Sequence, residues 1–228
     1  MAKRPTAATP QRVEDNPDDA FISGVVQASD WAQKNRQLLT IAGVVLVVLI
    51  GGLWYWRSFQ QGVDLQAVGE LERIQATIGM GDRDAARGEL NTFLERFGGT
   101  PSAAEARLLL GQLHLDSGDP AQAIVVLEPT VSDLDDPVNL QGGMLLGAAY
   151  ENAGRMDDAI RVYRRVADAA DLPFQATEAR LDAARLLAQE GDNSGAAALY
   201  QRVLDDLEEG DLQRPMVEMR LAEVRARS

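Results

Sequence analysis

The sequence contains no cysteine, a single histidine and few aromatic residues, which make up 5% of its 228 residues. The absence of cysteine excludes a disulfide framework, a thiolate metal site and the cysteine-based anchor of a bacterial lipoprotein. One histidine, His114, cannot form a multi-histidine metal cluster. Strands favour aromatic and β-branched residues, whereas Ala and Leu lose little in a helix. The scarcity of aromatics beside abundant Ala and Leu therefore predicts an all-α protein.

Lysine is absent from residues 58–228, where 16 arginines face 30 acidic side chains and leave a net charge of −14. Residues 1–37 are balanced, with five basic and five acidic side chains. A domain this acidic repels a phosphate backbone, which argues against a nucleic-acid-binding protein. The acidic excess by itself indicates only solubility.

Recognisable catalytic patterns are missing as well. The sequence has no Walker-type GxxxxGK[ST], GxSxG, HExxH or EF-hand loop. Asp133, Asp135 and Asp136 precede Pro137 and indicate a solvated turn more than a cation site, and Glu208, Glu209 and Asp211 are interpreted in the same way. His114 lies at a repeat position that indicates a core or groove residue. We therefore predict a protein that is not an enzyme and that holds no cofactor or metal.

One long uncharged stretch is present, LLTIAGVVLVVLIGGLWYW at residues 38–56. At roughly 1.5 Å per residue it spans about 28 Å, close to the thickness of a bilayer's hydrocarbon core. A cleaved signal peptide would have a short basic start and small residues at its end. Here 37 residues precede the stretch, and it ends in Trp54, Tyr55 and Trp56. The sequence therefore predicts an uncleaved transmembrane helix.

The flanking charges predict the orientation of this helix. Lys34 and Arg36 lie just before it, and Arg57 is the one basic residue just after it. Because basic residues favour the cytoplasmic side, residues 1–37 should lie in the cytoplasm. Residues 57–228 should form a domain in the periplasm, which places the protein in a bacterial inner membrane.

The cytoplasmic arm, residues 1–37, has two parts. Residues 1–20 contain three prolines and many polar residues, and they are predicted to be disordered. Residues 21–37 have apolar side chains at helical spacing. They are either a short helix lying on the inner leaflet or an extension of the membrane helix, and the sequence favours neither.

Four internal repeats follow. Segments that begin at Gly81, Gly118, Gly154 and Gly191 align without gaps over ten residues, and the glycines are 37, 36 and 37 residues apart. Five residues after each glycine comes an alanine, and nine residues after it comes a large side chain. These are Ala86, Ala123, Ala159 and Ala196, followed by Leu90, Leu127, Tyr163 and Tyr200.

Each repeat position has a physical explanation. Glycine takes the left-handed conformation that ends a helix, and Asp82, Asp119 or Asp192 after it can begin the next helix. The alanine is small because two helices cross closely there, and the large residue fills the space beside it. Each unit is therefore predicted to be a helical hairpin. Its first helices are expected at Gln66–Met80, Ala103–Ser117, Leu140–Ala153 and Ala176–Glu190, with a lone closing helix at Met216–Arg227.

Residues 65–227 resemble the tetratricopeptide repeat. The resemblance rests on the turn glycines, the small contact residues, and Leu110-Gly111 and Leu146-Gly147 within the first helices. The period of 36–37 residues exceeds the usual 34, and the Trp common in the first helix is missing. Together with the apolar stretch at residues 38–56, the resemblance implies a fold class: all-α, with a single transmembrane helix followed by a helical-hairpin solenoid of about four repeats and a closing helix.

The whole arrangement resembles a bacterial family, the ancillary subunit of the Sec translocon. The resemblance rests on three features: the segment before the anchor, from Asp30-Trp31 to Arg36; an anchor rich in Gly and Val that ends in Trp-Tyr-Trp-Arg; and divergent repeats. It implies a place beside the SecYEG channel and contact with periplasmic chaperones or non-native chains. The alternative is an adaptor or assembly factor for cell-wall or outer-membrane machinery. The sequence leaves the partner, the bound segment and the oligomeric state open.

Stacked hairpins commonly bind a peptide along the face formed by their first helices. By repeat register, the groove candidates are Gln75, Glu105, Gln112, Met144, Glu151, Arg185 and Gln189. The sequence does not distinguish this interpretation from ordinary solvent-facing positions. It also leaves open whether the closing helix fills the groove.

Overall fold

The computed structural model describes residue 31 and residues 34–227, and no strand occurs among them. The chain divides into two compact units, Met1–Phe59 and Gln60–Ser228. The predicted disordered arm and most of the segment at residues 21–37 lie outside the described residues.

The described part of the first unit is dominated by the N-terminal portion of helix α2 (Arg36–Gly79). Every residue from Leu38 to Phe59 is exposed. The hydroxyl of Thr40 donates to the carbonyl oxygen of Arg36 at 2.8 Å, so the one polar side chain of the apolar run is paired with its own helix. Among the described helices, α2 alone is long and apolar enough to cross a bilayer.

Helix α2 continues without a break into the first repeat. The sequence separates an apolar helix at residues 38–56 from a first repeat helix at Gln66–Met80, whereas the structure joins them. Residues 57–65 contain no proline and one glycine, Gly62. A single helical glycine costs only about 1 kcal/mol relative to Ala, which is too little to end a helix with strong formers on both sides.

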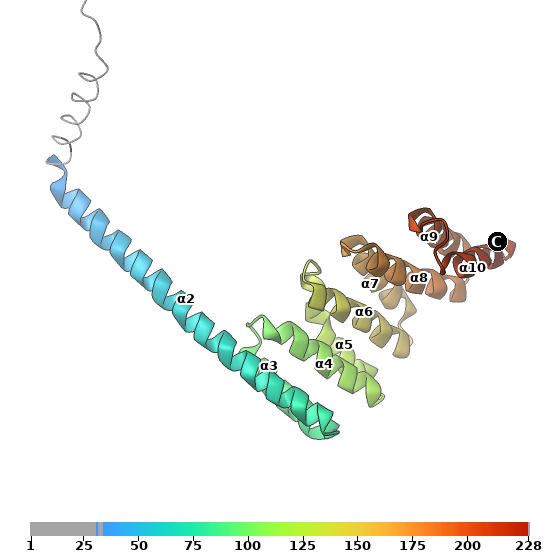
Figure 1. Cartoon of the computed structure of the whole chain (residues 1–228), viewed down its shortest axis with the longest axis horizontal. Coiled ribbons are helices and arrows are strands. Elements are labelled where there is room, and N and C mark those ends of the chain that lie inside the picture. The colour runs from blue at the N-terminus through green and yellow to red at the C-terminus, as the bar shows by residue number, and fades with distance from the viewer. Residues whose placement is uncertain (1–30, 32–33, 228) are drawn as a thin grey trace, which may run out of the picture. The chain divides into compact units, whose positions relative to one another are not determined.

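The second unit contains the rest of α2 and a series of shorter helices, in which each packs against its neighbours along the chain (Figure 1). They are α3 (Arg83–Phe97), α4 (Ser102–Asp116), α5 (Pro120–Leu127), η1 (Glu128–Ser132), α6 (Pro137–Asn152), α7 (Met156–Ala169), α8 (Pro173–Gln189), α9 (Asn193–Asp206) and α10 (Arg214–Ala226). The predicted hairpins are confirmed, with first helices that begin one to three residues earlier at α4, α6 and α8.

The predicted turn chemistry is also confirmed. The four turn glycines have φ angles between 72° and 88°, a conformation that side chains oppose. The carboxylates of Asp82, Asp119 and Asp192 accept hydrogen bonds from backbone amides in the first turns of α3, α5 and α9. Three residues separate the two helices of each hairpin.

The contact between the two helices of a hairpin explains the remaining small residues. A Cβ added at Gly111 would lie 2.6 Å from Cγ of Leu127, and one at Gly147 would lie 2.4 Å from Cε1 of Tyr163. The repeat alanines are fully buried at the same crossings. Glycine on the first helix therefore leaves the room that the large residue of the second helix occupies.

The second hairpin departs from the others because of Pro129. Helix α5 ends at Leu127 and passes into the 3₁₀ helix η1. Proline lacks an amide hydrogen and its ring clashes with the preceding turn, so an α-helix cannot continue through it. The side chain of Thr130 is buried here, and a Cβ at Gly142 would lie 2.7 Å from it. Gly142 thus lets α6 approach η1 closely.

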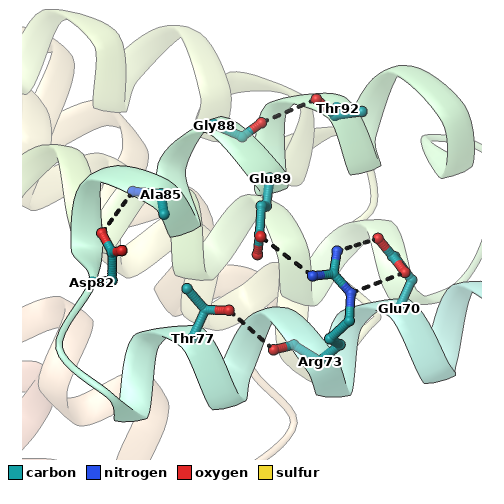
Figure 2. Close-up of polar contacts among 8 residues, drawn as sticks. All are labelled: Glu70, Arg73, Thr77, Asp82, Ala85, Gly88, Glu89 and Thr92. Atoms are coloured by element: carbon teal, nitrogen blue, oxygen red, sulfur yellow. Dashed lines mark hydrogen bonds and ion pairs between the residues drawn. The ribbon is translucent and has the colours of Figure 1, made fainter.

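Polar contacts reinforce the first hairpin. In Figure 2 the guanidinium of Arg73 on α2 lies between Glu70 on the same helix and Glu89 on α3. The Arg73–Glu89 contact is 3.3 Å long, and more than half of the Arg73 side chain is exposed. Exposed pairs of this kind contribute only about 0–1 kcal/mol. The apolar core therefore dominates the stability of the hairpin.

Two glycine-to-alanine substitutions should change stability in opposite directions. Gly111→Ala places a methyl group against the buried Leu127 and should destabilise the chain by about 1–3 kcal/mol. Gly88→Ala, in the middle of α3 with open space around its Cβ, should stabilise it by roughly 0.5–1 kcal/mol. Urea unfolding of the full chain in mild detergent, followed by circular dichroism, measures both. Equal effects would show that crowding at Gly111 is unimportant.

Candidate binding groove

A hollow of about 520 Å³ lies along helices α4 and α6. We call it the apolar hollow. Half-buried apolar side chains from the two helices form its walls, and the buried Tyr163 of α7 contributes its floor. Its lining residues are Leu108, Leu109, Gln112, Gln141, Met144, Leu145, Ala148, Tyr163 and Asp182. Asp182 is the one charged side chain among them.

The walls of this hollow are formed by residues that share one face of each helix. Leu108, Leu109 and Gln112 lie three and four residues apart on α4, so they share one helix face. Gln141, Met144, Leu145 and Ala148 follow the same spacing on α6. The opposite face of each helix carries the fully buried Leu110 or Leu146. The partly exposed apolar residues are therefore a second apolar stripe in addition to the core.

A second hollow of about 350 Å³ lies between α8, α9 and α10. We call it the mixed hollow, because its lining includes Arg185, Arg220, Asp182 and Glu223 as well as apolar residues. Helix α10 packs against α9, as the first helix of a further repeat would, and buries Val217, Leu221 and Val224. The closing helix thus forms a wall of this hollow and does not fill it.

A charged network stands between the two hollows. The guanidinium of Arg185 on α8 donates to both carboxylate oxygens of Glu151 on α6, at 2.8 and 2.9 Å, and to Asp182 at 3.1 Å. These hydrogen bonds hold the pKa of Glu151 below its usual range, although partial burial acts in the opposite direction. Asp182 lines both hollows, so the network fixes the side chains at their common border.

The structure places the seven predicted groove residues in three groups. Gln112 and Met144 line the apolar hollow, and Arg185 and Gln189 line the mixed hollow. Glu151 is the partner of Arg185. Gln75 on α2 donates to Glu105 on α4 at 2.7 Å, so these two join successive first helices but line neither hollow. The part of each residue in binding stays a prediction.

Sequence reasoning missed the apolar walls themselves. Leu108, Leu109, Leu145 and Ala148 follow the helical periodicity of core residues, and the pattern alone does not separate a buried stripe from a half-exposed one. Tyr163 and Asp182 were also absent from the candidates. The run Leu108-Leu109-Leu110 was the available signal, because one helix cannot bury three consecutive side chains on one face.

Two other polar residues singled out in the sequence, Asp136 and His114, lie outside both hollows. Asp136 caps α6 by accepting from the amides of Val138 and Asn139, at 2.8 and 3.1 Å. His114 is half-buried, burial lowers its pKa, and its Nδ1 has no hydrogen-bond partner among the described residues. No group of His, Asp and Glu in the described part of the chain is arranged to hold a metal ion.

Stacked hairpins with a lined hollow along their first helices define a helical-repeat protein of the kind that binds other proteins. The sequence matches the tetratricopeptide repeat-like domain family over residues 29–226. The chain therefore belongs to this family. Its repeats form a protein-interaction scaffold.

Solved structures show the same fold at low sequence identity. A kinesin light chain-like protein of Podospora anserina with nearly identical TPR-like repeats is 17% identical, with a TM-score of 0.55 over 71% of this chain and 86% of that one. The MamA protein is 18% identical, with a TM-score of 0.51 over 71% of this chain and 91% of that one. No curated protein matches the sequence significantly.

The Arg185–Glu151 pair should show a measurable coupling energy. A double-mutant cycle of Arg185→Gln and Glu151→Gln should give a coupling energy of about 1 kcal/mol at pH 7. The energy is no larger because both side chains are partly exposed to solvent. Because folding lowers the pKa of Glu151, this stabilisation should be complete above about pH 4.5 and disappear as the pH falls below it.

Urea unfolding of the full chain at pH 7 and pH 3 measures the coupling. Arg83 and Asp116, joined by a single contact of 3.2 Å with Arg83 well exposed, provide the control cycle and should give a coupling near zero. A coupling that persists unchanged at pH 3 would contradict the assignment.

Proposed function

We propose that this protein is a scaffold anchored in a bacterial inner membrane, where it serves as an ancillary component of the Sec translocon. In this proposal its repeats lie in the periplasm and bind extended or non-native segments of translocated chains. The observation that carries the proposal is the exposed apolar run at Leu38–Trp56, which shares helix α2 with the first repeat.

The energetics of the apolar run support a membrane anchor. Each large apolar side chain left in water instead of an apolar environment costs roughly 1.5–3 kcal/mol. No described residue covers any part of the run, and it contains no charge. The family match begins at residue 29 and therefore includes the run together with the repeats. The positions of Lys34 and Arg36 before the run favour a cytoplasmic N-terminus.

The chemistry of the apolar hollow suits chains of varied sequence. Its walls offer half-exposed Leu and Ala side chains and the flexible, polarisable Met144. Gln112 and Gln141 at its edge can donate and accept hydrogen bonds to a peptide backbone. Such a surface binds apolar side chains without requiring one sequence. Gln112 and Met144 are therefore proposed to contact the bound segment directly, with Arg185 and Gln189 beside it.

The assignment to the Sec translocon rests on the resemblance in sequence architecture. It is supported by the segment from Asp30 to Arg36 before the anchor, by the anchor's ending in Trp-Tyr-Trp-Arg, and by the divergent repeats. A test must therefore ask which complex the anchor selects. Full-length protein would be extracted from its native membrane in mild detergent, beside a matched variant whose residues 38–56 are replaced by an unrelated membrane helix.

SecYEG subunits should co-purify with the native anchor and disappear when the anchor is exchanged. Quantitative mass spectrometry of both samples measures this difference. If another envelope complex is enriched and SecYEG is absent, the scaffold is the adaptor of the alternative hypothesis. SecYEG that remains bound after the exchange would place the interaction outside residues 38–56.

Charge placed in the apolar hollow should weaken binding of an unfolded chain. Leu109→Glu combined with Met144→Glu should lower the affinity for carboxymethylated α-lactalbumin at least about tenfold, because two apolar contacts with the bound chain are lost. Val125→Glu with Phe174→Glu, at exposed apolar positions outside both hollows, is the matched control. Fluorescence anisotropy with full-length protein measures both. Equal losses would place the binding surface elsewhere.

A further inference from the structure

A third hollow, of about 240 Å³, lies between α7 and α9, the second helices of successive hairpins. We call it the arginine furrow. Arg164, Ala167 and Asp168 of α7 line one side of it, and Gly195, Ala198, Leu199 and Arg202 of α9 line the other. Arg180 of α8 completes it. None of these residues lines the apolar or the mixed hollow.

Two arginines of the furrow differ from all others in the repeat unit. Residues 58–228 contain 16 arginines and 30 acidic side chains, so partners are plentiful. Among the described residues from 58 to 227, Arg164 and Arg202 are nevertheless the two arginines whose side chains make no hydrogen bond, ion pair or ring contact. Both line the same furrow. Their guanidinium groups together retain ten N–H donors for an external ligand.

The third arginine is fixed in place. The Arg180 side chain is only 11% exposed, and its guanidinium donates to Asp206 at 2.7 Å. It therefore forms part of the furrow wall at a defined position, with its charge balanced by Asp206. Arg164 and Arg202, on helices α7 and α9, are the side chains free to close on a ligand from both sides.

The acidic groups near the furrow do not satisfy these arginines. Asp168 lines the furrow but makes no ion pair with Arg164 or Arg202 within the described structure. Asp192 lies near enough to Arg164 to sense its charge, but its carboxylate caps α9 by accepting from the amide of Gly195 at 2.8 Å. Asp206 is held by Arg180. The furrow thus has unused donors and no acceptor arranged to take them.

We propose that the arginine furrow binds two carboxylates of a short acidic segment on a partner protein. Guanidinium groups bind carboxylates through paired hydrogen bonds, which are stronger than those between neutral groups. An extended polyanion, such as nucleic acid or an anionic membrane surface, would meet the repulsion of a unit with net charge −14. A short segment with two adjacent acidic residues meets little of it.

This surface is separate from the groove on the first helices, so the repeats offer two docking sites of different chemistry. The apolar hollow takes apolar side chains, whereas the furrow selects carboxylates. The inference does not depend on the Sec assignment, because it requires only the fold and the residues on α7, α8 and α9. It adds a recognition site for a partner to the proposed site for a translocated chain.

Full-length protein in mild detergent would be titrated against a fluorescein-labelled capped peptide with two adjacent Glu residues between Gly-Ser flanks. The same peptide with Gln in place of Glu is the ligand control. Arg164→Gln with Arg202→Gln should weaken binding of the Glu peptide about tenfold or more, because charge-assisted hydrogen bonds are lost. Arg83→Gln with Arg161→Gln removes the same charge outside the furrow and should change the affinity less than about twofold.

Preference for the Glu peptide over the Gln peptide, lost in the furrow variant alone, would support the proposal. Equal affinity for the two peptides, or equal loss in both double variants, would overturn it. Sedimentation velocity provides a second measurement. Self-association that disappears in Arg164→Gln with Arg202→Gln would also overturn the proposal, since a second copy of this acidic chain would then be the occupant.

Discussion

The close approach of the two helices within each hairpin is the constraint on which the repeat unit depends. Small residues on one helix leave a gap that a large side chain on the other fills, as Gly111 does for Leu127 and Gly147 for Tyr163. Interiors packed at this density tolerate little change in volume. The spacing of each hairpin therefore follows from a few positions, and the glycine turns and aspartate caps only have to bring the helices together.

Stacking of the hairpins then creates surfaces that no single repeat contains. The first helices α4 and α6 turn one apolar stripe into the core and leave a second one half-exposed, which becomes the apolar hollow. Ties such as Gln75–Glu105 and Arg185–Glu151 join successive first helices across 30 and 34 residues of sequence. Each tie is weak by itself, because its members are partly exposed. Together they fix the side chains along the face that we propose to bind other chains.

The distribution of charge separates the surfaces by chemistry. The repeat unit is strongly acidic, which keeps it soluble and disfavours polyanions. Three features differ from this acidic surface, and solubility does not explain them. They are the uncovered apolar run, the apolar hollow and the pair of unpartnered arginines. In our proposals these features meet a bilayer, the apolar side chains of a protein segment, and carboxylates.

The sequence by itself determined the helical hairpins, their period, their turns and their caps. These features depend on residues within a few positions of each other, such as Gly118 and Asp119, so local patterns suffice to predict them. The tertiary structure alone decided the half-exposure of Leu108 and Leu145 and the absence of partners for Arg164 and Arg202. These features depend on how side chains from successive repeats meet in space, and that geometry follows from the packing of whole helices.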